Sequence, residues 1–191
     1  MKNIATKSQT KSISRAFPTS LTISVQVLLL LMTGFLATWL HFRFRIPLNM
    51  PGRHGLEFML LVMGARALSE LRITSTITIS GSILATMIPG LHYGDPMLPV
   101  TYLMMGIVID FAWYKWRSVW VWIPLAALLG GFVYSFIPVI RMIFSPMFGI
   151  MHNSLKGGLL FPWFTHLTFG FIGALAGVGL VTGLKKMRGK K

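Results

Sequence analysis

Side chains that bind small ligands gather between the long apolar runs of this chain. Imidazole, carboxylate and amide groups that converge in a hollow orient a ligand through a few hydrogen bonds. The sequence has no cysteine, so thiol catalysis, disulfide bridges and cysteine-ligated metals are excluded. The ligand-forming groups that remain are the five histidines and the acids and amides near them: His41, Asn49, His54, Glu57, His92, Asp95, His152, Asn153 and His166.

Neutral imidazole is a good ligand for transition metals, so a histidine metal site is an open alternative. No two of the histidines stand three or four residues apart, which is the spacing that places two ligands on one face of a helix. The sequence also lacks the HExxH motif, the GxSG motif of rhomboid-like serine proteases and a Walker-type phosphate-binding loop. We therefore predict no metal, no cofactor and no catalytic residues, and we predict that the protein is not an enzyme.

Three arginines, Arg43, Arg45 and Arg53, stand close together in the segment 41–55. A planar guanidinium binds carboxylates and phosphates through paired hydrogen bonds, so Arg53 is a candidate for binding an anionic ligand. The alternative is contact with anionic lipid headgroups. Glu57 falls in the first turn of a predicted helix, where its negative charge stabilises the helix N-terminus and can pair with Arg53. An acid within a membrane span is also a functional candidate.

The elements that must position these groups are apolar helices. The chain has 191 residues, of which 54% are hydrophobic and 12% charged. Within span 73–91 the segment ITSTITIS alternates as a strand does, but an open strand in lipid leaves backbone polar groups unpaired, so we predict a helix with a buried Thr/Ser face. A helix crosses the bilayer with about 20 apolar residues. We predict an all-α, polytopic membrane protein with six transmembrane helices in one bundle, at residues 21–40, 55–71, 73–91, 97–116, 119–140 and 161–184.

Lysine and arginine indicate the orientation of this bundle, because cytoplasmic loops carry the excess of both. With six spans and the N-terminus inside, 13 of the 18 basic residues are cytoplasmic and 5 are outside, whereas omission of span 55–71 reverses the balance to 6 against 12. We predict a multi-pass protein of the cell (inner) membrane with a cytoplasmic basic tail at 1–20, a six-helix domain at 21–184 and a second cytoplasmic basic tail at 185–191. Lipid contact and topology then explain the net charge of +14, and no nucleic-acid partner is predicted.

The predicted topology gathers the ligand-forming groups on the outer side of the membrane. Loops 41–55, 92–96 and 141–160 all face outward in this arrangement, so we predict a pocket beneath them that binds a small molecule. The alternative is that these side chains line the headgroup interface. The predicted substrate-binding residues are Asn49, Arg53, His54, Glu57, His92, Asp95, His152, Asn153 and His166.

Small residues and one charged pair predict how the helices pack. Arg66 and Asp110 both fall near the cytoplasmic ends of their helices, so we predict a structural ion pair between them, with Lys115 or Arg117 as alternative partners of Asp110. Glycines four residues apart let helices approach closely, within the bundle or toward a partner subunit. The glycines predicted for helix packing or partner contact are Gly173, Gly177, Gly179 and Gly183.

The six predicted helices, the basic inside N-terminus and an outer Pro/Gly-rich loop leading into GLEFMLLVMGAR resemble the substrate-binding S components of energy-coupling-factor (ECF) transporters. The resemblance implies that RIPLNMPGRHG, HYGDP and MHNSLKGG close over a ligand as loops 1, 3 and 5. It also implies docking on a transmembrane coupling subunit that cytoplasmic ATPases drive. Metal-binding members of that family begin with a Met-His motif, which this chain lacks, so the resemblance favours an organic ligand such as a vitamin.

Small-molecule uptake is therefore the leading function expected from the sequence. In this hypothesis the chain captures a small organic ligand, anionic if Arg53 binds it, and partner proteins hydrolyse the ATP. A structural or assembly subunit of a larger membrane complex is the alternative, which the glycine-rich span 161–184 and the basic tail suit equally well. A small intramembrane enzyme with the histidines in its site is the third and least favoured alternative.

Overall fold

The computed structural model describes residues 19–43, 50–88, 95, 97–116, 122–149, 155 and 157–188, and all regular structure in these ranges is helical. Pro138 lacks the N–H that would bond to the carbonyl of Tyr134, and the fifth rod breaks beside that position, at Ser135. Because α5 and α6 form one apolar rod, the described residues make six helical rods, and the prediction of an all-α chain with six helices is confirmed. The elements are α1 (Thr19–Arg43), α2 (Gly55–Leu68), α3 (Thr74–Thr86), α4 (Leu98–Lys115), α5 (Ile123–Tyr134), α6 (Phe136–Phe144), a short 3-10 helix η1 (Ser145–Phe148) and α7 (Leu160–Arg188).

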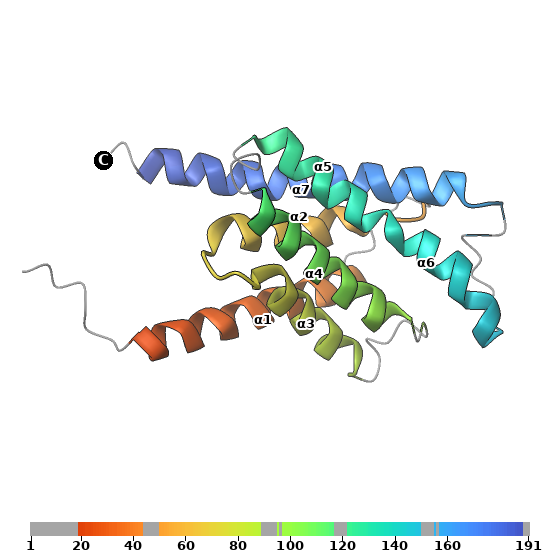
Figure 1. Cartoon of the computed structure of the whole chain (residues 1–191), viewed down its shortest axis with the longest axis horizontal. Coiled ribbons are helices and arrows are strands. Elements are labelled where there is room, and N and C mark those ends of the chain that lie inside the picture. The colour runs from red at the N-terminus through yellow and green to blue at the C-terminus, as the bar shows by residue number, and fades with distance from the viewer. Residues whose placement is uncertain are drawn as a thin grey trace, which may run out of the picture.

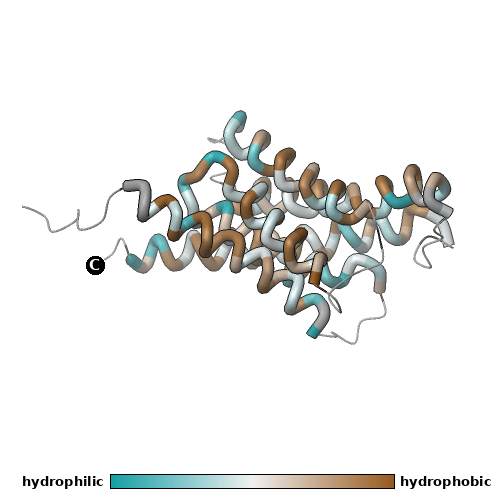
Figure 2. The backbone as a smooth tube through the Cα atoms, turned by 90° about the horizontal axis from the view of Figure 1, so that it is seen from below, coloured by the Kyte–Doolittle hydropathy of each residue, from teal (hydrophilic) through white to brown (hydrophobic). Residues whose placement is uncertain are grey.

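Three of these rods are long and apolar enough to cross a membrane: Thr22–His41, Ile123–Phe144 and Leu160–Arg188. Their outward faces carry large apolar side chains, such as Leu28 and Leu29 on α1, which are 59% and 61% exposed. An apolar surface of this extent is unusual in a soluble monomer. Hydrophobic stretches run along the middle of the helices (Figure 2). The three candidate spans therefore suggest a multi-pass membrane protein.

The second and third predicted spans are shorter in the structure than in the prediction. α2 has 14 residues and α3 has 13. At 1.5 Å per residue each is about 20 Å long, against a hydrocarbon core of about 30 Å. α2 ends early because Arg66 folds over its last turn and donates to the carbonyls of Ser69 and Arg72, at 3.0 and 3.1 Å. The predicted helix in place of a strand at 73–91 is confirmed for the described residues, and α7 runs to Arg188, into the segment predicted as a tail.

The hydroxyls of α3 are buried against protein, as predicted. Thr78 donates to the carbonyl of Thr74 in its own helix at 2.8 Å, and Ser82 donates to the carbonyl of Gly34 in α1 at 2.8 Å. Glycine makes this contact of α1 with α3 close, because a Cβ at Gly34 or Gly81 would collide with the backbone of the other helix. Bonds within α3 satisfy the hydroxyls of Thr78, Ser80 and Thr86, and the two glycines allow the backbones to touch.

Helices α1 and α7 run in opposite directions along the long axis of the molecule (Figure 1). We call the end where α1 begins and α7 ends the tail end. The opposite end, where α1 ends and α2, α4 and α7 begin, is the loop end. α7 packs along both α2 and α5, and α1 packs mainly along α3. The core between them is filled by buried apolar side chains, and the largest of those with almost no exposure are Met59, Met63, Ile79, Met105 and Ile109.

A buried ion pair joins α2 to α4 at the tail end, as predicted. Arg66 Nη1 donates to Asp110 Oδ1 at 3.0 Å. Asp110 also caps the start of α3, because Oδ1 accepts from the N–H of Ser75 at 2.9 Å and Oδ2 accepts from the N–H and the hydroxyl of Thr76, both at 2.8 Å. Arg66 Nε has no hydrogen bond among the described residues, but the guanidinium lies 5.8 Å from the ring centroid of Trp113. One carboxylate thus ties three helices together.

Candidate functional site

A polar cavity lies at the loop end of the bundle, where five separate segments meet. Its volume is about 210 Å³, which is below the range typical of drug-sized ligands and suits a small one. The cavity is open to one side, and aromatic and imidazole rings form most of its wall. The residues that line it are His41, Gly52, His54, Leu98, Tyr102, Tyr134, Ile137, Arg141 and His166.

Glycine brings the segment before α2 into this cavity. Gly52 has φ +78°, a conformation that favours glycine, and a Cβ there would lie 2.8 Å from the Cα of His166 in α7. Gly55, the first residue of α2, has no room for a Cβ against the ring of Tyr134. A turn bond from the N–H of Gly55 to the carbonyl of Gly52, 2.8 Å long, then starts the helix. These two glycines place His54 between α1 and α5.

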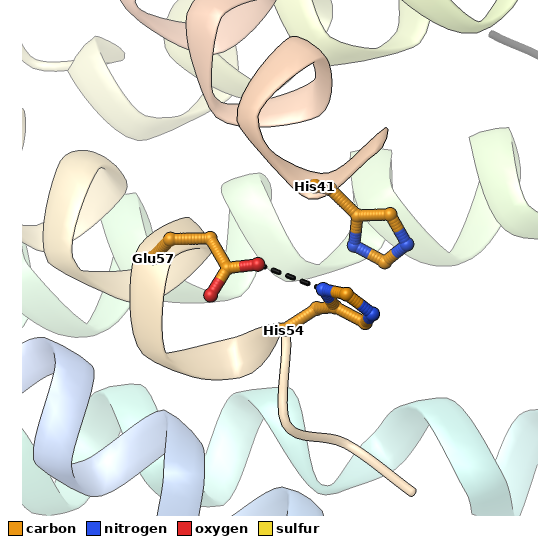
Figure 3. Close-up of side chains that lie close together, drawn as sticks. All are labelled: His41, His54 and Glu57. Carbon is orange, nitrogen blue, oxygen red and sulfur yellow. Dashed lines mark hydrogen bonds and ion pairs between the residues drawn. The ribbon is translucent and has the colours of Figure 1, made fainter. Parts of the chain in front are cut away.

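His54, Glu57 and His41 form a compact cluster beside the cavity (Figure 3). His54 Nδ1 lies 2.7 Å from Glu57 Oε1, and Arg53 Nε donates to His54 Nε2 at 3.2 Å. Because Nε2 accepts from the arginine, Nδ1 carries the proton and donates a hydrogen bond to Glu57. The ring of His41, at the end of α1, lies over that of His54 with a centroid distance of 3.5 Å and a tilt of 37°.

The second oxygen of Glu57 differs from the first in its surroundings. Glu57 Oε2 is buried and makes no hydrogen bond to any described residue. A buried carboxylate oxygen without a donor costs free energy, and such atoms are rare in folded proteins. Glu57 therefore has unused capacity to bind a cation or a hydrogen-bond donor next to the two imidazoles.

Asp95 and Arg141 form a second charged pair at the loop end. Arg141 Nε donates to Asp95 Oδ2 at 2.7 Å, and Asp95 Oδ1 accepts from the N–H of Met97, at 3.0 Å, just before α4. Asp95 is buried, while Arg141 also reaches the cavity wall. Asp95 therefore holds Arg141 in place between α4 and α6.

His166 and two tyrosines make the aromatic part of the wall. His166 Nδ1–H donates a hydrogen bond to the carbonyl of Pro162 at 2.7 Å. Nε2 is therefore an acceptor when the ring is neutral. The rings of Tyr134 and His166 stack at a centroid distance of 5.3 Å, and Tyr102 lies 4.8 Å from Phe58. The wall thus combines flat apolar faces with polar tips, which suits a small ligand.

The structure brings together every described member of the predicted set. Arg53, His54, Glu57, Asp95 and His166 all lie at the loop end, in the cavity wall or one contact behind it. Asn49, His92, His152 and Asn153 lie outside the described residues.

Among the lining residues with polar side chains, sequence reasoning missed four as members of the site: His41, Tyr102, Tyr134 and Arg141. A usable signal existed for Tyr134, which is the single tyrosine in the uncharged span 119–140. A polar-tipped ring at such a position usually finds a partner in the protein interior. No local signal separates His41 or Arg141 from side chains at the headgroup interface.

A second hollow lies nearer the tail end, between α1, α2 and α7. It is an apolar groove of about 350 Å³, with Leu29 and Leu60 among its lining residues. Gly177 lines it too and packs against the backbone of α2, as does Gly173. A Cβ at Gly179 or Gly183 would meet no described atom within 4 Å. Two of the four predicted packing glycines thus serve the bundle, and the other two lie on an open face.

Fold and site together define an all-α bundle with three helices that could cross a membrane and a small polar pocket at one end. Comparisons of the chain with protein-family models, with curated proteins and with solved structures find no match. Function is therefore inferred from the geometry of the loop end.

Proposed function

We propose that this protein is a membrane-embedded capture subunit that takes a small ligand into its loop-end pocket as the first step of uptake. The observation that supports this most is the cavity of about 210 Å³ in which side chains from α1, α4, α6, α7 and the segment before α2 converge. A bundle that only holds a complex together needs an apolar interior and no polar hollow. Here three imidazoles, two phenols and a guanidinium share one hollow.

Six crossings with both termini in the cytoplasm belong to the same proposal. α2 and α3 are individually short, but protein groups satisfy the backbone where they meet, namely Arg66 at the carbonyls of Ser69 and Arg72 and Asp110 at the start of α3. Non-helical backbone is tolerated at membrane depth where it is buried in protein in this way. The tail end also carries the basic last turn of α7, which favours the cytoplasmic side.

The sequence lacks a Walker-type phosphate-binding loop, so in this proposal other proteins hydrolyse the ATP that drives uptake. The resemblance to S components of ECF transporters suggests a transmembrane coupling subunit with cytoplasmic ATPases as the partners. The open face of α7 at Gly179 and Gly183, and the apolar groove beside it, favour a second candidate function, that of an assembly subunit. In that function the loop-end cavity binds no ligand.

Thiol labelling tests the topology directly, because the natural chain has no cysteine. Met50→Cys and Met187→Cys are a matched pair, since both methionines are exposed and lie at opposite ends of the bundle. We expect a membrane-impermeant maleimide to label Met50→Cys on intact cells and Met187→Cys only after lysis. The reverse pattern, or labelling of both from one side, would remove the outward-facing pocket.

Native mass spectrometry tests capture itself. The full chain, purified from its own cells in mild detergent, is expected to retain a small ligand as an added mass. His54→Ala, in the cavity wall, is expected to lose that mass, while Leu180→Ala, in the apolar groove, keeps it. Equal retention by the two variants, or no added mass in the natural chain, would favour the assembly function.

A further inference from the structure

We propose that His41, His54 and Glu57 bind a divalent first-row transition-metal ion, and that this ion is the ligand that the loop-end pocket captures. The role of the ion as cargo rests on the proposed function, whereas the site itself does not. The three residues come from the end of α1, the turn before α2 and the first turn of α2. They thus meet only in the folded bundle.

The distances suit a site that closes around an ion. One ligand atom from each of the three residues lies within 4.8 Å of the other two. Ligand atoms about 2.1 Å from a tetrahedral metal ion lie roughly 3.4 Å from each other. Rotations of the three side chains that move their ligand atoms by about an ångström therefore bring these atoms to bonding distance from one ion. Figure 3 shows the two rings and the carboxylate turned toward a common point.

The donor set selects the class of metal. Two imidazole nitrogens and one carboxylate oxygen suit zinc, nickel, cobalt and copper, whereas magnesium and calcium prefer oxygen ligands alone. Three protein ligands also leave at least one coordination position open for water or for an exchanging carrier. Through the open position a carrier ligand can reach the ion and take it from the site, as transport requires.

The bare oxygen of Glu57 points to a missing cation rather than to a finished structural contact. Glu57 Oε2 is buried without a partner among the described residues, and a metal ion would satisfy it. Arg53 Nε donates to His54 Nε2 at 3.2 Å, so an ion that binds this nitrogen must displace the guanidinium. A structural role for the His54–Glu57 bond, as an aid to the first turn of α2, leaves the overlying ring of His41 and the bare oxygen unexplained.

The absence of a histidine pair at helical spacing does not count against this site. His41 and His54 stand 13 positions apart and lie on different elements, so their rings meet through the packing of α1 against α2. Helical spacing tests only for ligands that share one helix.

Isothermal titration calorimetry on the full chain in lipid nanodiscs, with Zn²⁺ and Co²⁺ as separate probes, tests the site. We expect His41→Ala, His54→Ala and Glu57→Gln each to weaken binding by at least about tenfold. Leu180→Ala is the control, because Leu180 lies in the apolar groove away from the loop-end cavity, and it is expected to bind as the natural chain does. Arg53→Gln is expected to bind several-fold more tightly, since it removes a positive charge beside the ion.

Two readouts keep the result separate from misfolding. Thermal unfolding followed by circular dichroism reports whether each variant is folded, and the visible absorption of bound Co²⁺ reports its coordination. Loss of the Co²⁺ absorption in folded His41→Ala and His54→Ala, with retention in Leu180→Ala, supports the site. Unchanged affinity in both His41→Ala and His54→Ala, or an equal loss in Leu180→Ala, overturns it.

Metal accumulation in cells separates the site from the proposed function. Cells with His54→Ala at the native locus are expected to accumulate less of the bound metal than cells with the natural chain. If the purified chain binds metal through the three residues but accumulation is unchanged, the site stands and the uptake function fails. If native mass spectrometry finds an organic ligand that His54→Ala loses, and calorimetry finds no metal binding, capture stands and the metal site fails.

Discussion

Each end of the bundle holds a carboxylate, and the two carboxylates differ in how many of their oxygens make hydrogen bonds. At the tail end, Asp110 is buried and both of its oxygens are bonded, to Arg66 and to the N–H groups that start α3. At the loop end, Glu57 shares one oxygen with His54, and the other oxygen is buried without a partner in the described part of the chain. Protein groups alone bond both oxygens of Asp110, while Glu57 lies beside the loop-end cavity.

This difference separates a structural acid from a candidate ligand. A buried charge whose bonds are all made within the protein serves the fold, and removal of a partner leaves an uncompensated charge. A buried charge with unused bonding capacity weakens the fold until something binds. Asp110 and Glu57 therefore differ in the number of carboxylate oxygens that make hydrogen bonds, which is two for Asp110 and one for Glu57.

Asp110→Asn is expected to have the largest effect on stability. It leaves Arg66 as a buried cation without its counter-charge and places an amide N–H₂ among the donors of Ser75 and Thr76. Breaking a buried ion pair at one partner costs about 3–5 kcal/mol, so we expect a large fall in the unfolding temperature in detergent and poor recovery of folded chain. A melting temperature within a few degrees of the natural chain would show that the tail-end network is dispensable.

Glu57→Gln is the matched change at the loop end, and a much smaller effect on stability is expected. The introduced amide would keep a carbonyl oxygen as acceptor for His54 Nδ1–H and would remove the buried, half-bonded charge. We expect the free energy of unfolding without metal to change by about 1 kcal/mol or less, in either direction. A loss as large as that of Asp110→Asn would make Glu57 a structural acid and end the contrast between the two ends.

The features that could be predicted from sequence are those that depend on one helix or on topology. Apolar runs located the long rods, and the shared depth of Arg66 and Asp110 indicated their ion pair. Arg53, His54 and His166 could be assigned to one end of the bundle because the direction of each helix follows from the order of the spans.

Features that depend on packing could not be predicted. The contact between His41 and His54 requires α1 and α2 to meet at one particular place, and the place of Arg141 in the wall depends on its bond to Asp95. The early end of α2 follows from Arg66, which bonds to carbonyls beyond the helix in addition to Asp110. Each of these depends on groups distant in sequence or on a turn, which apolar periodicity does not describe.

Gly183→Ala is expected to have the smallest effect, and its comparison with Gly177→Ala sharpens the division between structural and partner surfaces. A Cβ at Gly177 would lie 2.9 Å from the backbone nitrogen of Gly64 and closer still to the carbonyl of Leu60, so α2 and α7 must move apart, at a cost of about 1–3 kcal/mol. A Cβ at Gly183 meets no described atom, so the free energy of unfolding is expected to change only as much as for a surface substitution, about 0.5 kcal/mol.

Size-exclusion chromatography of the complex recovered from the native membrane completes the test. If Gly183→Ala leaves the chain stable but strips away other subunits, the open face of α7 is an assembly surface, and the tail end serves partners while the loop end serves the ligand.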